Sequence, residues 1–173
     1  MLDETSGTSG LDTPNPFGVM EASARSYPPG DRRDELARSP ARVFCLVVGA
    51  TLVLVGILGF IADSAFDTGS GVQGDDFIIF EVNGWHNVVH LASGLFLLAL
   101  MGRHDTARIA ALSFGAIYGV VTIIGLIDGE NVIGLFPVDA ADNVLHIVLT
   151  VAAFAAGLAP LRDRTAGRAP RTA

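Results

Sequence analysis

The sequence of 173 residues contains no lysine and only one cysteine, Cys45. A single cysteine excludes an intramolecular disulfide, a cysteine redox pair and a zinc site built from several cysteines. The phosphate-binding pattern GxxxxGK followed by Ser or Thr is also absent, because it requires a lysine. A formal net charge of −7 argues against nucleic-acid binding, since phosphate backbones attract basic surfaces. These absences exclude disulfide-rich, P-loop and nucleic-acid-binding proteins.

Charge of either sign is scarce as well. Charged residues make up 17% of the chain and hydrophobic residues 50%, whereas a soluble domain carries about a quarter charged residues. The deficit lies between Val43 and Leu161, where long apolar runs follow one another. We therefore expect a membrane domain over residues 43–161, a disordered polar tail over residues 1–42 and a short basic tail over residues 162–173.

Four apolar runs divide the expected membrane domain. Val43–Ala62 contains no charged residue, and its length matches the roughly 20 residues that cross the hydrocarbon core of a bilayer. The second run is shorter and carries three polar residues, His86, Asn87 and His90, in its opening turns. The sequence predicts an all-α membrane protein with four transmembrane helices, over residues 43–62, 85–101, 107–127 and 143–159.

The charged residues are partitioned between the connections. All 11 basic residues are arginine, and they lie in the two tails and around the second connection: Arg25, Arg32, Arg33, Arg38, Arg42, Arg103, Arg108, Arg162, Arg164, Arg168 and Arg171. The first and third connections hold acids instead: Asp63, Asp67, Asp75, Asp76, Glu81, Asp128, Glu130, Asp139 and Asp142. Because basic residues stay cytoplasmic, both termini are expected inside and both acidic connections outside. The lysine-free composition, rich in Ala, Gly and Arg, suggests a GC-rich bacterial genome and hence the bacterial inner membrane.

The second half of the membrane domain resembles the first half. Gly49 and Gly59 of the first run align with Gly115 and Gly125 of the third run at one constant offset. The stretch NVVHL of the second run likewise aligns with NVLHI of the fourth run. We therefore expect an internal repeat of two helical hairpins with the same orientation, related by an axis along the membrane normal. The repeated glycines are interpreted as helix-packing positions.

Three stretches of the chain, FEVNGWHNVVHLASGLFLL, FGAIYGVVTIIGLI and LFPVDAADNVLHIVL, resemble the bacterial four-helix membrane proteins catalogued as domain of unknown function 4383. The resemblance covers about Arg42–Leu161 and leaves the N-terminal tail outside. Its most specific elements are NGWHNVVH, here called the first polar box (Asn83–His90), and DAADNVLH, the second polar box (Asp139–His146). The resemblance implies an uncharacterised integral membrane protein of bacteria, with no assigned activity, substrate or cofactor.

The two polar boxes admit a chemical interpretation. His86 and His90 are four residues apart and share one helix face, and the aligned positions of the second box are Asp142 and His146. If the repeat brings the two helices together, these four residues form a set suited to Zn²⁺, Cu²⁺ or Fe²⁺. Facing histidines also ligate haem iron, and buried His and Asp also relay protons.

The alternative interpretation treats the boxes as structural fittings. Polar side chains in a first helical turn satisfy free backbone N–H groups, and Asn87 and Asn143 are placed to bridge to a neighbouring helix or to orient the histidines. Interhelical hydrogen bonds of this kind contribute about 0.6–2 kcal/mol and fix helix register. The sequence favours this interpretation for Asn87, His90, Asn143 and His146, because no catalytic motif such as HExxH accompanies them.

The functional expectation follows from these two interpretations. We expect a non-enzymatic structural or accessory membrane protein, with no catalytic residue and no cofactor, that associates with the lipid bilayer and with other subunits or copies of itself. The alternative is a metal- or haem-binding protein with a redox or transport role, its site formed by His86, His90, Asp142 and His146 at the outer face. A small transporter or channel is a third hypothesis, and it requires oligomerisation.

Overall fold

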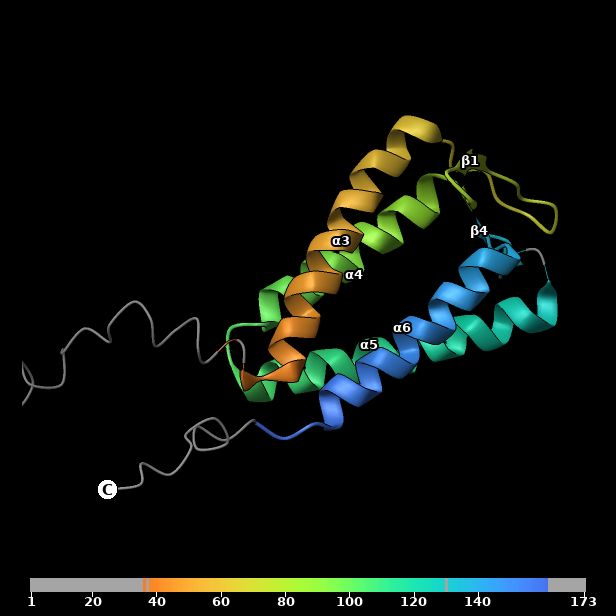
Figure 1. Cartoon of the computed structure of the whole chain (residues 1–173). Helices are drawn as coiled ribbons and strands as arrows, with labels where there is room; N and C mark the ends of the chain where they lie inside the picture. The colour runs from red at the N-terminus through yellow and green to blue at the C-terminus, as the bar shows by residue number, and fades with distance from the viewer. Residues whose placement is uncertain (1–35, 37, 130, 162–173) are drawn as a thin grey trace, which may run out of the picture.

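A computed structural model gives the structure of the protein and describes residues 36, 38–129 and 131–161. The remaining parts of the two predicted tails lie outside the described residues. The described elements, in chain order, are α3 (Pro40–Ala62), β1 (Asp75–Phe77), β2 (Phe80–Val82), α4 (Gly84–Leu100), α5 (His104–Asp128), β3 (Asn131–Val132), β4 (Phe136–Pro137) and α6 (Ala140–Leu158) (Figure 1).

Each of the four predicted helices corresponds to a helix of the fold. Helices α3, α5 and α6 are long and apolar enough to cross a membrane, and α4, with 17 residues, is a shorter apolar helix. Three of the helices begin three residues before the predicted apolar runs, because a polar turn precedes the apolar residues. In α3, Ser39 is the N-cap and its hydroxyl accepts a hydrogen bond from the Arg42 N–H, with Pro40 in the first turn. Apolar length alone does not detect such turns.

The helices form two antiparallel hairpins, α3 with α4 and α5 with α6, that converge at one end and spread apart toward the other (Figure 1). The convergent half holds the larger apolar core. Its buried members come from all four helices: Ala41, Phe44, Cys45, Leu52, Leu97, Ala107, Ala110, Ala111, Phe114, Tyr118 and Ala153. Small residues on α5 let α3 approach closely there, so this core fixes the hairpins against each other.

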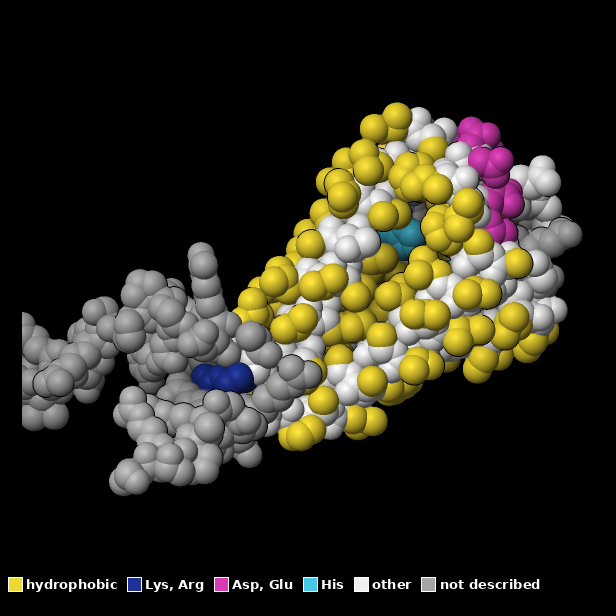
Figure 2. Space-filling view, viewed as in Figure 1, with side chains coloured by type: hydrophobic (Ala, Val, Ile, Leu, Met, Phe, Trp, Pro, Cys, Tyr) yellow, Lys and Arg dark blue, Asp and Glu magenta, His cyan; other side chains and the backbone are white. Residues whose placement is uncertain are grey.

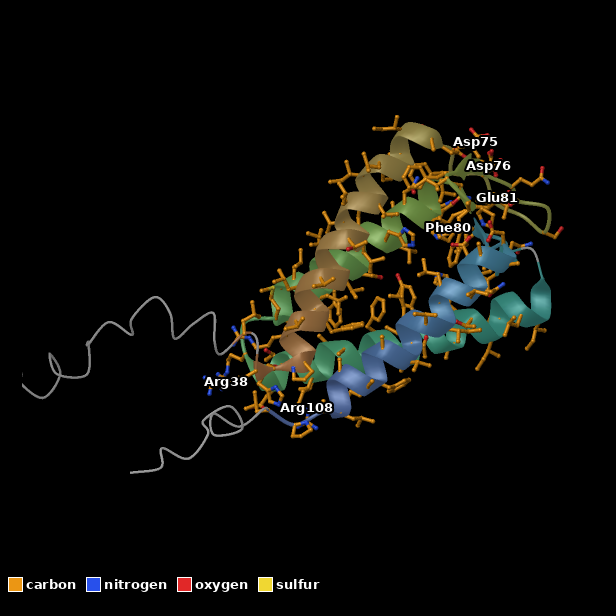
Figure 3. All side chains as sticks on the ribbon, viewed as in Figure 1. Arg38, Asp75, Asp76, Phe80, Glu81 and Arg108 are labelled. Carbon is orange, nitrogen blue, oxygen red and sulfur yellow. The ribbon has the colours of Figure 1, made fainter. Side chains whose placement is uncertain are left out.

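Charged side chains separate to the two ends of the helices. Arg38 and Arg108 lie at the convergent end, whereas Asp75, Asp76 and Glu81 lie at the spread end (Figure 3). We call these the arginine end and the acidic end. Arginines also hold the hairpins closed, since Arg42 Nε donates to the Met101 carbonyl at 3.0 Å and Arg108 Nε to the Gly157 carbonyl at 2.9 Å. Between the ends the visible surface is mostly hydrophobic, as a surface in contact with lipid requires (Figure 2).

Two short β-hairpins cover the acidic end, and the sequence does not predict them. β1 pairs with β2, and β3 with β4, each antiparallel. The β-hairpin segments connect the two helical hairpins to each other. Asn83 Nδ2 donates to the Leu135 carbonyl at 3.0 Å, and the Glu81 N–H donates to Asp139 Oδ2 at 3.2 Å. Strands of two or three residues are too short to show a period in the sequence, and the turn residues Ile78 and Ile133 have positive φ angles that their side chains disfavour.

The α3–α4 hairpin is packed backbone to backbone at one crossing point. A Cβ atom added to Gly94 would lie 2.7 Å from the Gly49 carbonyl oxygen and 2.8 Å from the Val53 nitrogen. Only glycine allows this approach. The crossing fixes the register of α4 on α3 and, with it, the position of the first polar box along the axis of α3.

Candidate metal centre

The first residue of each polar box, Asn83 or Asp139, is the N-cap of the helix that follows it. Asn83 Oδ1 accepts a hydrogen bond from the His86 N–H at 2.9 Å at the start of α4. At the start of α6, Asp139 Oδ1 accepts from the Asp142 N–H at 2.8 Å, and Asp142 Oδ2 accepts from the Asp139 N–H at 3.4 Å. These bonds satisfy backbone N–H groups that a helix leaves free. Part of each box is therefore structural.

The asparagines of the boxes lock each helical hairpin. Asn87 Nδ2 donates to the Asp63 carbonyl at 2.9 Å, at the end of α3, and the Asn87 amide lies directly against Gly59. In the other hairpin Asn143 lies against Gly125, where an added Cβ would be 2.6 Å from Asn143 Oδ1. Each asparagine thus occupies space that a glycine of the neighbouring helix provides.

Three histidines from the two boxes converge between the helical hairpins. One ring nitrogen of each of His86, His90 and His146 lies within 4.8 Å of the others. The exposed fractions of the three residues are 2%, 7% and 3%. His86 and His90 lie one helical turn apart on α4, and His146 reaches them from α6. The cluster therefore draws on both hairpins at the level where they begin to spread.

The ring of His86 lies among the backbone carbonyls of Glu81 and Pro137 and the carboxyl group of Asp142. Nδ1 lies 3.2 Å from the Glu81 carbonyl oxygen, which can only accept, so Nδ1 carries the proton and donates. In the neutral ring this leaves an unprotonated Nε2, which faces Asp142 Oδ1 at 3.8 Å. A ring lone pair and a carboxylate lone pair do not attract each other. A proton or a metal cation between them would reconcile this arrangement.

The other two imidazoles have unused nitrogens. Among the described residues, neither His90 Nδ1 nor His146 Nδ1 has a hydrogen-bond partner, and both atoms are buried. The rings instead make edge contacts: His90 lies 4.5 Å from the His86 ring, and His146 lies 5.1 Å from the ring of Tyr118, centroid to centroid. Buried polar atoms without partners are uncommon in native proteins and call for an explanation.

Tyr118 is a neighbour of the site that the sequence does not single out. It lies on α5, is 3% exposed, and stacks on Phe114 with ring centroids 4.0 Å apart. Its position on α5 resembles that of any aromatic residue in a membrane helix. Only the packing of α5 against α6 shows that its ring touches His146.

An apolar cavity of about 280 Å³ adjoins the cluster. Its walls come from α3, from the β1–β2 hairpin and from α6, and its polar end is formed by His90, Asp142 and His146. In Figure 2, histidine surface is visible at the bottom of a hollow surrounded by hydrophobic side chains. The cluster is thus reached from the side of the molecule, between helices whose outer surfaces are apolar.

The distances suit coordination after a small adjustment. Nitrogens bound to a tetrahedral zinc ion lie about 2.0–2.1 Å from the metal and hence about 3.4 Å from one another. Closing the widest separation from 4.8 Å to that value takes no more than about 1.4 Å, which side-chain rotation can supply. Of the four predicted site residues, the fold groups the three histidines and sets Asp142 beside His86. The fourth histidine of the chain, His104, lies at the arginine end and hydrogen-bonds Ser39 at 2.7 Å.

One glycine-rich segment, Gly69–Gly74, reads GSGVQG and has the GxGxxG spacing of dinucleotide-binding turns. That spacing binds pyrophosphate only where it joins a strand to the start of a helix. Here it lies between the end of α3 and strand β1, and no helix follows it directly. The segment therefore lacks the structural context of a dinucleotide site.

Comparison with known proteins gives one finding. The family model described as Domain of unknown function (DUF4383) matches residues 42–159, which include both polar boxes and nearly all of the four helices. No curated protein and no solved structure matches the chain. The family description adds no activity, so the chemistry rests on the site itself.

Proposed function

Because the chain belongs to the DUF4383 family, a domain of unknown function, we propose a function from its site: a multi-pass integral membrane protein that binds one first-row transition-metal ion between its two helical hairpins. The ligands are a ring nitrogen each from His86, His90 and His146. One observation carries the proposal, the convergence of three buried imidazoles from two hairpins within 4.8 Å.

Structural fitting accounts for the helix caps and for the Asn87 bridge, but not for the buried atoms without a partner among the described residues, which include Nδ1 of His90 and His146 and Oδ1 of Asn87 and Asn143. Asn83 and Asp139 cap the helices, and Asn87 bridges α4 to α3. The unpaired nitrogens of His90 and His146 contribute nothing to either task. Burying a polar atom without a partner costs about 1–3 kcal/mol. A cation bound by these nitrogens would remove that cost for His90 and His146 together.

The donor set selects the kind of metal. Imidazole nitrogens favour Zn²⁺, Cu²⁺ and Fe²⁺ over Mg²⁺ and Ca²⁺, which prefer oxygen ligands. Asp142 supplies negative charge next to His86, and this offsets part of the cost of a divalent cation in a region of low dielectric constant. Haem fits less well, because the adjoining cavity of about 280 Å³ is smaller than the roughly 300–1,000 Å³ that drug-sized ligands occupy.

Orientation and repeat are part of the proposal. With the arginine end in the cytoplasm, both termini lie inside and the metal centre lies near the outer face of a bacterial inner membrane. Helix α4 is proposed as the fourth span, although its 17 residues extend only about 25 Å. The internal repeat is supported by matching contacts: Asn83 and Asp139 are N-caps 56 positions apart, and Arg42 and Arg108, 66 positions apart, each bind the end of the partner helix.

A structural or accessory role remains the second candidate. The capping bonds and the Asn87 bridge favour it, since they fix helix register without any ligand. This candidate predicts a folded protein that carries no metal and that tolerates loss of the histidines.

Metal analysis of the full-length protein, purified in lipid nanodiscs without chelators, separates the two candidates. We expect about one transition-metal ion per chain in the unmodified protein and a loss of nearly all of it in His90→Ala and in His146→Ala. His104→Ala is the matched control, because it removes a histidine outside the cluster and should keep the metal. Folded protein without stoichiometric metal would contradict the proposal and support the structural role.

A further inference from the structure

We propose that the apolar cavity next to the three histidines binds a neutral isoprenoid quinone that enters sideways from the bilayer. The proposal deepens the metal-centre function and rests on it in one respect, that an oxygen of the quinone ring takes the coordination position left open by three histidine ligands. Catalytic metal sites with three protein ligands keep such a position for water or substrate.

The walls of the cavity determine where a ligand comes from. Val47 of α3 and Leu145 of α6 line it and are 57% and 38% exposed, on helices long and apolar enough to cross a membrane. A mouth between lipid-facing side chains opens toward hydrocarbon and not toward water. The ligand must therefore dissolve in the membrane.

The inner end of the cavity determines the head group. His90, Asp142 and His146 are its polar members apart from Thr51, whose hydroxyl donates to the Val47 carbonyl at 2.8 Å. An acyl chain has no polar atom at its tip and would leave the imidazoles unpaired. A head that bears an oxygen atom satisfies them or binds the metal they hold.

The acidic residues around the cavity favour a ligand with a neutral head group. Asp142 lines the cavity, and Glu81 and Asp139 lie close behind it at the acidic end. Arg42 and Arg108 are at the opposite end of the helices, where they bind the Met101 and Gly157 carbonyls. These three carboxylates already exceed the charge of a divalent ion, so a fatty acid or a lipid phosphate would add further negative charge to a low-dielectric site without a basic partner among these residues, which is costly.

Aromatic and branched side chains define the shape of the ligand. Phe77 and Phe80 of the β1–β2 hairpin line the cavity, and Phe80 lies at the same end of the molecule as Glu81 (Figure 3). Flat rings pack favourably against aromatic faces. Val55 and Leu149 give the branched surface that isoprene units match. A volume of about 280 Å³ admits a single ring with the start of its tail and leaves the rest of the tail in lipid.

The test uses a photoreactive azido-quinone with a ten-carbon tail, added to the full-length protein in nanodiscs. After illumination, peptide mass spectrometry identifies labelled positions and metal analysis is run on the same samples. We expect saturable labelling of the segments 47–55, 77–82 and 142–149. Unlabelled decyl-ubiquinone should compete, whereas oleate and decanol at the same concentration should not.

Two variants that fill the cavity from opposite walls make the test specific. Thr51→Trp and Leu149→Phe should lower labelling at least about tenfold without changing the metal content. The matched controls Leu54→Trp and Val148→Phe enlarge neighbouring lipid-facing residues, 56% and 57% exposed, and should label normally. The proposal is overturned if the filling variants label like their controls, or if oleate or decanol competes as well as the quinone.

The metal measurement separates this proposal from the function on which it rests. Metal without saturable labelling overturns the quinone site and leaves the metal centre standing. The converse outcome is a protein that carries no metal and still shows saturable labelling that Thr51→Trp abolishes. That result supports quinone binding to the imidazoles and contradicts the metal centre.

Discussion

The two helical hairpins are built alike where they are held together and differ where they meet. Each has an N-cap at the start of its second helix, Asn83 or Asp139, and an asparagine packed on a glycine of its first helix. The histidines that end the two boxes, His90 and His146, face the same cluster. Between cap and histidine the boxes diverge, with His86 in one and Asp142 in the other. The shared positions build the hairpins, and the divergent position makes the cluster asymmetric.

The hairpins also differ in how tightly their helices pack. At the α3–α4 crossing, backbone meets backbone through Gly49 and Gly94. In the α5–α6 hairpin the corresponding contacts are with side chains: a Cβ on Gly115, which aligns with Gly49, would lie 3.1 Å from Ala153 Cβ, and a Cβ on Gly119 would lie 3.4 Å from the methyl group of Thr150, which aligns with Gly94. The first hairpin thus carries two of the clustered histidines on a backbone-to-backbone crossing, and the second carries one on a crossing between side chains.

Making the boxes alike tests the asymmetry and has the largest expected effect. His86→Asp copies the second box into the first and replaces the imidazole with a shorter carboxylate side chain, so metal affinity should fall by more than the roughly 10–100-fold typical of outer-shell changes. Asp142→His copies the first box into the second and should keep the metal, because three imidazoles remain. Competition with a metal-sensing dye measures both affinities. Equal affinities in the two variants would contradict the assignment of His86 as a ligand.

Exchanging the crossing residues tests the difference in packing. Gly94→Ala forces a Cβ against the Gly49 carbonyl and the Val53 nitrogen, and should lower the free energy of unfolding by about 3 kcal/mol. Thr150→Ala removes the hydroxyl group and the γ-methyl group, creates no such clash and should cost about 1 kcal/mol or less. Unfolding in mixed micelles by increasing the fraction of denaturing detergent measures both. Comparable losses would mean that the two crossings are equally close.

The asparagine–glycine contacts give the smallest expected difference. Gly59→Ala places a Cβ directly on the Asn87 amide and should cost about 2 kcal/mol, whereas Gly125→Ala, with a less severe overlap, should cost about 1 kcal/mol. The double variant Gly59→Ala with Asn87→Ala no longer has the clash. Its loss in free energy of unfolding should therefore be smaller than the sum of the losses in the two single variants. Strict additivity in this cycle would show that the contact is not what constrains Gly59.

The sequence predicts the helical part of the fold because apolar length and charge are local properties. Val43–Ala62 has no charge over the length of a membrane span, and α3 covers it. The early helix starts follow from Ser39 and Asp139, whose capping role depends on backbone geometry. The β-hairpins at the acidic end are held by bonds between distant segments, such as Asn83 to Leu135, that no local pattern contains.

The site was only partly accessible from the sequence. The four-residue spacing of His86 and His90 predicts one shared face, and alignment of the boxes singles out Asp142 and His146 as partners. That the rings converge, and that Asn87 turns instead to the end of α3, depends on how the hairpins pack. The contact of Tyr118 with His146 and the apolar cavity arise between helices, and residue spacing along one helix carries no signal for either.

X-ray absorption at the metal edge of the protein in nanodiscs tests the central claim most directly, since it counts the ligands and measures their distances. We expect three imidazole nitrogens at about 2.0–2.1 Å from one ion in the unmodified protein, and two in His146→Ala after metal is added back at high concentration. A spectrum dominated by oxygen ligands, or an imidazole count that does not change in His146→Ala, would contradict a metal centre shared by the two hairpins.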